Sequence, residues 1–482
     1  MKKNLIITSL LTITLLTSCG GKGLTTNNNV SVTFRTTAEN KDSAISNLTY
    51  DENWFFKDSY TYNEDLAEMS LGLTLSSADN EEYDVDNKTG DKNIKQLYED
   101  LGFSSESYYS VGFNEEDTDK VALSIASKNV TNSGKESTIL SINLRGIGYG
   151  SGGWISNFNI GEGKEDIDNT DNKQYHLGFY TAGLFAFNEI KTYVTDKNID
   201  LDNTKVWLTG FSRSAAAANI ASIFLGDIMD RKNIYTYAFA TPAYKVNVTN
   251  DELLKNIFNI INSGDIVPMI PPIEWDFGIE GTKVELPLIT EDTRSSFETE
   301  LYNLCGITYT GLNDYESISK SMINMLLKYA PSREEYALVL EDAVKSIFNR
   351  KDDGSIDYSY IDNILSCEGT NEDAISIESL IESVKGIDFS DITAIIGLVT
   401  KIGNTLNAGE EYWGNKDSYN DELLEKISEI ISFAITLYMG AGTDEEQLAF
   451  DTLKEIGTLG VTSPLLEQHW GEVYLARLRM HS

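Results

Sequence analysis

Histidine and cysteine are scarce in this chain, which has three of each among 482 residues. Zinc sites draw most of their ligands from these two residue types. With so few of them, and no cluster in the sequence, we expect neither a metal centre nor a cofactor. The scarcity also narrows the choice of a catalytic base, since an imidazole can come only from His176, His469 or His481.

Basic residues are also few. The chain has 38 Lys and Arg against 75 Asp and Glu, a formal net charge of -37. A surface of this kind repels nucleic acid and anionic lipid headgroups. A glycine-rich phosphate-binding loop is absent from the sequence as well. We therefore expect no nucleic-acid partner.

The apolar run at the N-terminus, Leu5 to Leu16, is too short to span a membrane. Behind a cationic start it is typical of a secretory signal. The run ends in Leu-Thr-Ser-Cys, which resembles a bacterial lipobox, and this resemblance implies cleavage before Cys19 and lipidation of its thiol. We expect residues 1–18 to be a signal peptide and 19–30 a lipidated polar tether. The alternative is a plain signal peptide with an incidental cysteine.

A lipid anchor would place the protein in the bacterial cell envelope, at the outer membrane or the cell surface. Cys305 and Cys367 are the two remaining cysteines. In an oxidising compartment they could form a disulfide, or they could stay as two buried free thiols.

A serine between small residues stands where an apolar strand-like run, Val206 to Thr209, gives way to an alanine-rich helical pattern. A sharp turn at such a junction exposes a nucleophilic hydroxyl. Small residues two before and two after the serine let strand and helix approach closely. Gly210 fits the first place, and Ser214 stands where glycine is usual. Ser212 is thus a candidate nucleophile, or else only the N-cap of the helix.

A nucleophilic serine needs a base, and the base needs an orienting carboxylate. Asp265 follows the buried strand-like run Ile257 to Ile261, at the sheet edge where ligands gather in open α/β folds. It could instead be an ordinary turn residue. In α/β-hydrolases the chain order is serine, acid, histidine.

His469 is the histidine that fits this order. His176 precedes Ser212, and His481 is the penultimate residue and is expected to fray. We therefore predict Ser212 as nucleophile, His469 as general base and Asp265 as orienting acid. The alternative for His469 is a partly buried polar residue without a catalytic role.

Several blocks, taken together, resemble class 3 lipases, the α/β-hydrolases that include fungal triacylglycerol lipases and feruloyl esterases. The resemblance covers roughly residues 120–290 well and the region of His469 weakly. The blocks are a strand ending in Arg-Gly with a tryptophan after it (Leu140–Gly146, Trp154), a His-x-Gly-Phe block (Tyr175–Phe179), the serine turn, a core strand with its proline (Tyr235–Pro242), and the stretch Asn262–Pro272.

The resemblance implies the same three catalytic roles and adds an oxyanion hole. Its donors would be the backbone N–H groups of Arg213 and Ile147. Many relatives carry Ser or Thr at the second place. Because Ile147 has no hydroxyl, the resemblance implies a weaker oxyanion hole here. The histidine at the place of His176 is structural in the family.

Strand-like and helical patterns alternate in the middle of the chain, which favours a mostly parallel sheet. We expect an α/β-hydrolase core over residues 31–290, flanked by helices and with N-terminal additions that include a helix near Tyr60 to Leu75. The expected strands are Val121–Val130, Thr138–Leu144, Val206–Thr209, Tyr235–Ala240 and Ile257–Ile261.

Residues 291–455 change to helical patterns, so a large helical insertion separates Asp265 from His469. It either packs on the core or caps the active site. Residues 456–482 would then return His469 to the core. The predicted helices are Ile318–Tyr329, Glu334–Phe348, Ile375–Val384, Ile392–Ile402 and Leu423–Met439.

These observations predict a monomeric, membrane-anchored, lipase-like serine hydrolase acting on a lipid or other ester. Two alternatives stay open. One is a carbohydrate-ester hydrolase of the feruloyl type on the same scaffold, since a fold does not fix a substrate. The other is a surface lipoprotein that has the hydrolase fold and binds a ligand but catalyses no reaction.

Overall fold

A computed structural model describes ten stretches of the chain: residues 24–35, 43–78, 89–113, 120–145, 156–161, 174–249, 252–309, 311, 315–336 and 464–481. Cys19, Ile147 and Cys367 lie outside these residues, and so do Trp154 and most of the predicted helical insertion.

A central sheet of seven strands has the order β11-β9-β7-β6-β5-β4-β3. The strands from β5 to β11 run parallel, while β3 and β4 join antiparallel at one edge. The predicted mostly parallel α/β-hydrolase sheet is confirmed. The strands are β3 (Tyr109–Val111), β4 (Leu123–Asn132), β5 (Lys135–Leu144), β6 (Thr204–Phe211), β7 (Ile234–Phe239), β9 (Ile257–Ile261) and β11 (Thr282–Glu285).

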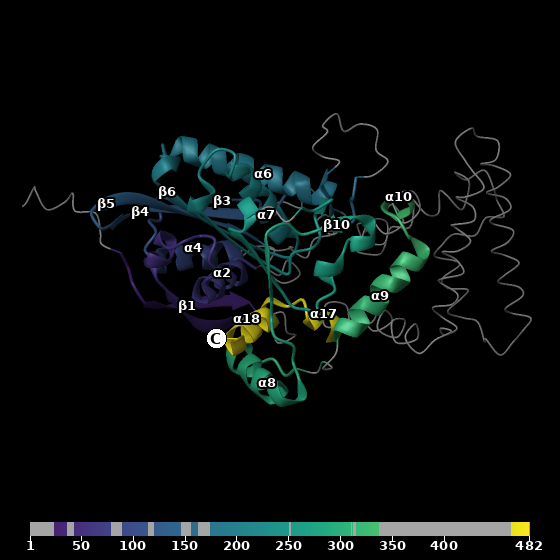
Figure 1. Ribbon diagram of the computed structural model, residues 1–482. Coiled ribbons are helices and arrows are strands. Elements are labelled where there is room, and N and C mark those ends of the chain that lie inside the picture. Colours follow the sequence, from purple (N-terminus) through teal and green to yellow (C-terminus); the bar gives the residue numbers. More distant parts are fainter. Residues whose placement is uncertain are drawn as a thin grey trace, which may run out of the picture.

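Helices cover both faces of this sheet (Figure 1). On one face lie α6 (Leu177–Asp196) and α7 (Arg213–Leu225), which pack against each other and against the strands. The buried alanines of α7 allow this close approach. On the other face lie α2 (Glu64–Ser76), α4 (Thr89–Asp100) and the C-terminal helix α18 (Gly471–His481).

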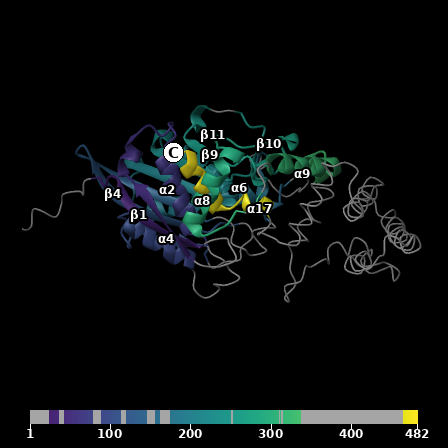
Figure 2. The same cartoon turned by 90° about the horizontal axis from the view of Figure 1, so that it is seen from below.

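A second, two-stranded antiparallel sheet of β1 (Asn28–Arg35) and β2 (Ser43–Tyr50) packs on α2 and α4. Figure 2 shows β1, α2, α4 and α8 on the side seen from below. The backbones of Thr25 and Glu52 are hydrogen-bonded at 2.9 Å, and Leu24 packs on the apolar core. Residues 24–30, which we expected in the tether, are therefore part of the folded body.

The chain continues from the core into α8 (Glu291–Cys305), α9 (Tyr315–Tyr329) and α10 (Arg333–Glu335). The predicted helix Ile318–Tyr329 lies within α9. Cys305 is a buried free thiol whose Sγ donates to the Leu301 carbonyl at 3.1 Å. This is the free-thiol alternative for Cys305.

The last described segment holds α17 (Pro464–Glu467) and α18, which packs between α2 and α8. A short antiparallel pair, β8 (Lys245–Val246) and β10 (Phe277–Gly278), lies beside the main sheet. Among the described residues, no helix is long and apolar enough to cross a membrane.

Candidate active site

Ser212 lies in the turn between β6 and α7 with φ 59° and ψ -131°. A residue other than glycine adopts such a conformation only where its surroundings hold it. Here its N–H donates to the Phe239 carbonyl at 2.8 Å, and its own carbonyl accepts from Ala215 N at 2.8 Å. Ser212 occupies the N-cap position of α7, but its side chain makes no capping hydrogen bond. The hydroxyl is thus directed away from the helix.

The two small residues around Ser212 do what the sequence pattern predicts. A Cβ on Gly210 would lie 2.4 Å from the Ser214 carbonyl oxygen, so any larger residue would force β6 and α7 apart. Ser214 Oγ accepts from Phe211 N at 3.1 Å and lies 3.0 Å from the Leu144 carbonyl. A serine in place of the usual glycine therefore adds hydrogen bonds to the turn.

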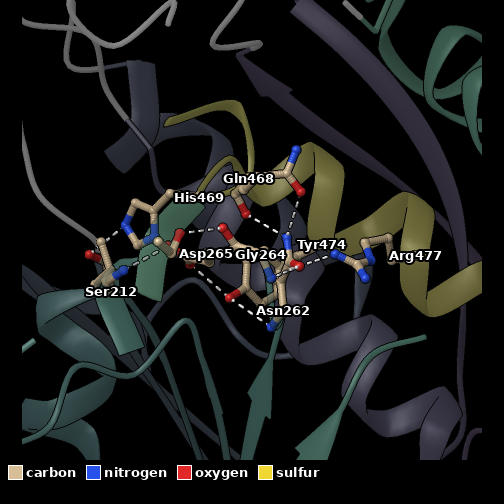
Figure 3. Close-up of polar contacts among 10 residues, drawn as sticks. Ser212, Asn262, Gly264, Asp265, Gln468, His469, Tyr474 and Arg477 are labelled. Carbon is tan, nitrogen blue, oxygen red and sulfur yellow. Dashed lines mark hydrogen bonds and ion pairs between the residues drawn. The ribbon is translucent and has the colours of Figure 1, made fainter. Parts of the chain in front are cut away.

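The structure brings Ser212, His469 and Asp265 together in one hydrogen-bonded chain (Figure 3). His469 Nε2 lies 2.8 Å from Ser212 Oγ, and His469 Nδ1 lies 2.7 Å from Asp265 Oδ2. With a proton on Nδ1, the imidazole donates to the carboxylate and its Nε2 accepts from the hydroxyl. This is the arrangement of a nucleophile, a base and an orienting acid.

Three separate elements supply these side chains. Ser212 follows β6, Asp265 follows β9, and both strands end at the same edge of the parallel sheet. His469 arrives from the turn between α17 and α18, and its N–H donates to the Leu466 carbonyl at 2.9 Å. Its ring packs on Phe211 with 5.3 Å between ring centroids.

Asp265 is fully buried, and three donors converge on its carboxylate. Oδ1 accepts from Val267 N at 2.9 Å, while Oδ2 accepts from the Tyr474 hydroxyl at 2.8 Å as well as from His469. Burial, reinforced by the charge of Asp265, raises the pKa of Tyr474 well above its ordinary value. Tyr474 therefore stays a protonated donor and fixes the carboxylate.

Further hydrogen bonds hold the residues around Asp265 in place (Figure 3). The Asn262 side chain accepts from Gly264 N at 3.0 Å and donates to the Gln468 carbonyl at 2.8 Å. Asn262 N donates to the Tyr474 hydroxyl at 3.1 Å. The turn that carries Asp265 and the turn that carries His469 are thus tied to each other. Asn262 began a block singled out in the sequence, but Tyr474 and Gln468 were not recognised there.

The expected oxyanion donors are described only in part. Arg213 is the first residue of α7, directly after the nucleophile. Its guanidinium donates to the Lys120 carbonyl at 2.8 Å and to Ser156 Oγ at 3.0 Å, which anchors this residue beside the turn. Ile147, the other expected donor, lies outside the described residues.

The other two histidines lie elsewhere. His176 is fully buried before α6, where its Nε2 lies 3.0 Å from the Asn157 carbonyl and its ring stacks on Phe179 at 3.9 Å. These are the contacts of a packing residue. His481 is the last residue of α18. The described residues contain no group of three or more His, Cys, Asp or Glu side chains placed to hold a metal ion.

Comparison with protein families gives a match that covers part of the site. Residues 142–275 match the family model for lipase (class 3), and this segment contains both Ser212 and Asp265. Comparison with curated proteins gave no match.

Solved structures similar to this chain include two lipases and a third protein from another organism. Rhizomucor miehei triacylglyceride lipase is 17% identical with a TM-score of 0.30, covering 46% of this chain and 78% of its own. A Yarrowia lipolytica lipase is 15% identical with a TM-score of 0.27, covering 54% and 82%. A protein from Penicillium cyclopium is 20% identical with a TM-score of 0.25, covering 38% and 64%. Likeness at this level decides nothing about substrate. The segment that carries Ser212 and Asp265 is similar to class 3 lipases.

Proposed function

We propose that this protein is a serine carboxylic ester hydrolase of the lipase type that works through an acyl-enzyme. The observation that carries the proposal is the unbroken hydrogen-bonded chain from Ser212 Oγ through His469 to Asp265. The family match over residues 142–275 supports it independently.

In the first half-reaction Ser212 Oγ attacks the ester carbonyl while His469 Nε2 accepts the hydroxyl proton. Asp265 stabilises the imidazolium that forms and holds its orientation. The N–H of Arg213 would donate to the oxyanion, joined by that of Ile147. Collapse of the tetrahedral intermediate breaks the ester C–O bond, and the leaving alcohol takes the proton from His469.

In the second half-reaction His469 deprotonates a water molecule, which attacks the acyl-enzyme and releases a carboxylic acid from Ser212. As the bond between the acyl carbon and Ser212 Oγ breaks, Oγ takes the proton back from His469, and the imidazole is neutral again. Because the three residues act as a unit, removing one is expected to lower kcat by roughly 10⁴-fold or more.

A fluorophosphonate probe tests the chemistry directly, because the activated serine displaces fluoride and forms a P–O bond. We expect the wild-type protein to be labelled, Ser212→Ala to be unlabelled, and His469→Ala to be labelled far more slowly. Ser133→Ala, at an exposed turn serine between β4 and β5, is the matched control and should label normally. Full labelling of Ser212→Ala would show that Ser212 is not the nucleophile. An unlabelled wild-type protein would favour the alternative of a non-catalytic binding lipoprotein.

The substrate class is a separate part of the proposal. Turnover of a short-chain nitrophenyl ester, a triacylglycerol emulsion and a feruloyl sugar would separate a lipase from a carbohydrate esterase. We further propose that Cys19 carries a lipid that anchors the protein in the bacterial cell envelope, which the lipobox-like Leu-Thr-Ser-Cys supports.

A further inference from the structure

Arg477 on α18 buries its guanidinium beside the candidate site. The residue is 3% exposed. Its Nε donates to the Pro287 carbonyl at 3.0 Å, and its other nitrogens donate to the same carbonyl and to Asn262 Oδ1. All these acceptors are neutral. A buried cation is costly unless a negative charge compensates it.

The negative charge that faces Arg477 through the hydrogen-bond network is Asp265. Arg477 bonds the Asn262 side chain, Asn262 N donates to the Tyr474 hydroxyl, and Tyr474 donates to the Asp265 carboxylate. Asp265 is 1% exposed, so solvent screens this pair weakly. Burial lowers the pKa of Arg477 to about 10, while the negative charge of Asp265 opposes the fall. The guanidinium is still charged at neutral pH.

Other titratable groups surround the pair from the neighbouring elements. Burial raises the pKa of the Cys305 thiol at the end of α8 to about 12, and it raises the pKa of Tyr309. Both groups are therefore neutral at neutral pH. Among the described residues, Glu472 on α18 acts electrostatically on Cys305, and Glu467 before His469 and Tyr315 on α9 act on Tyr309.

Arg479, two residues further along α18, shows the contrast. It forms ion pairs with Glu68 of α2 at 2.5 Å and Glu300 of α8 at 3.2 Å, and its side chain is 23% exposed. Its charge is compensated by carboxylates that have no part in the site. Arg479 is therefore a matched control for Arg477.

We propose that Arg477 is a positioning residue whose positive charge balances buried Asp265 and so keeps His469 neutral and able to accept the proton of Ser212. The proposal rests on the proposed ester hydrolysis. Without this charge, the Asp265 carboxylate would be compensated by protonation of the imidazole instead. Protonated His469 cannot act as a base. The acid limb of kcat/KM should then move to higher pH.

Three variants separate charge from shape. Arg477→Gln removes the positive charge, and Arg477→Lys keeps the charge but loses the planar guanidinium. Arg479→Gln removes the positive charge of a neighbouring residue. Charged groups in proteins interact with an effective dielectric constant of about 20, so we expect an upward shift of the acid limb of roughly half to one pH unit in Arg477→Gln. Arg477→Lys should restore the wild-type limb, and Arg479→Gln should not move it.

The readouts are the pH dependence of kcat/KM and of fluorophosphonate labelling, beside the thermal melt. If Arg477→Gln folds poorly, Arg477→citrulline, made by ligating a synthetic C-terminal peptide, gives a neutral group of the same shape. A lower melting temperature with an unmoved acid limb would make Arg477 merely structural. An equal shift in Arg477→Gln and Arg477→Lys would also overturn the proposal.

A further measurement does not depend on turnover. Carbon-13 labelling of the three histidine rings allows the His469 titration to be followed by NMR, with His469→Asn for its assignment. We expect the titration midpoint to rise in Arg477→Gln by the same amount as the acid limb. If the wild-type protein hydrolyses no ester and takes no label, the proposed function fails, whereas the NMR midpoint still decides whether Arg477 controls the charge of His469. An unchanged midpoint would refute that control.

Discussion

Single residues of this site adopt states that are unfavourable by themselves. The positive φ of Ser212 costs of order 1–3 kcal/mol, and the surrounding hydrogen bonds offset this cost. Asp265 and Arg477 bury opposite charges that are linked through Asn262 and Tyr474. Unfavourable states of this kind are typical of sites where the geometry at a reacting atom matters. Here Ser212 and Asp265 both contact His469.

His176 allows a test of packing against catalysis at this scale. His176→Ala removes a fully buried ring, its stacking on Phe179 and its bond to the Asn157 carbonyl, so we expect a loss of about 2–4 kcal/mol and a melting temperature lower by several degrees. Activity per folded molecule at low temperature should stay within about tenfold of wild type.

His469→Ala should do the reverse, with turnover lost and the melting temperature nearly unchanged. His481→Ala should change neither quantity. The measurements are specific activity on a short-chain nitrophenyl ester and the thermal melt of each variant. Loss of turnover in a well-folded His176→Ala, together with normal turnover in His469→Ala, would mean that the base is wrongly assigned.

At the scale of elements, the core strands could be predicted because β-branched apolar runs are buried on both faces. The predicted strand Ile257–Ile261 has the bounds of β9, and the predicted helix near Tyr60 begins at Glu64 because Asn63 caps it, accepting from Leu66 N at 3.1 Å. β1 was missed, although the buried Val30, Val32 and Phe34 alternate with more accessible residues in the pattern of a half-buried strand.

Of the candidate site, the sequence analysis predicted Ser212, Asp265 and His469, which follow the order of serine, acid and histidine along the chain. Serine, acid and base each follow a recognisable local pattern or an order along the chain. Tyr474 and Arg477 belong to no such pattern. Their contacts are with Asp265 and Asn262, far earlier in the sequence: Tyr474 and Asp265 are 209 residues apart. Only the packing of α18 beside the sheet edge brings them there.

The strand–turn–helix element gives a prediction of its own. In Gly210→Ala the new Cβ would meet backbone atoms of Ser214 at 2.4 Å and 2.7 Å, which cannot move without shifting α7. We expect a loss of about 1–3 kcal/mol in stability, and at least a tenfold loss of kcat/KM because Ser212 shifts with the helix.

Gly134→Ala is the control, since a Cβ there meets nothing within 4 Å and its φ of +81° costs only about 1 kcal/mol. It lies in the turn between β4 and β5, so its kcat/KM should equal that of the wild type. Unfolding in denaturant and steady-state kinetics check both variants. A fully active and stable Gly210→Ala would show that strand and helix need not approach so closely.

At the scale of the whole molecule, the first described residues, which follow the proposed anchor in sequence, and the candidate site lie at opposite ends of the central sheet. Thr25 N donates to the Glu52 carboxylate at 2.7 Å, and Glu52 pairs with Lys128 at 2.5 Å. Lys128 of β4 pairs with Ile139 of β5, which in turn pairs with Lys205, the second residue of β6. Ser212 follows the last residue of the same strand.

These positions limit which membrane the site can reach. By covalent geometry, the five residues from Cys19 to Leu24 span at most about 18 Å. The 8 residues of β6 alone extend about 26 Å. The tether is therefore too short to let the body turn its catalytic edge onto the bilayer that holds the lipid. The net charge of -37 further disfavours contact with an anionic surface.

We therefore predict that the lipidated protein hydrolyses soluble esters, or esters presented on separate particles, and spares ester lipids of its own membrane. Proteoliposomes with a fluorogenic ester lipid either in the same vesicles or in added vesicles measure the two rates. Inserting about 20 Gly and Ser residues between Gly23 and Leu24 should raise the same-vesicle rate several-fold while leaving the rate on a soluble ester unchanged. Cys19→Ser should stay out of the vesicle fraction and keep the soluble rate. If the protein with its native tether attacks its own vesicle as fast as the lengthened variant does, the distance from anchor to site does not govern access, and the membrane itself becomes a candidate substrate.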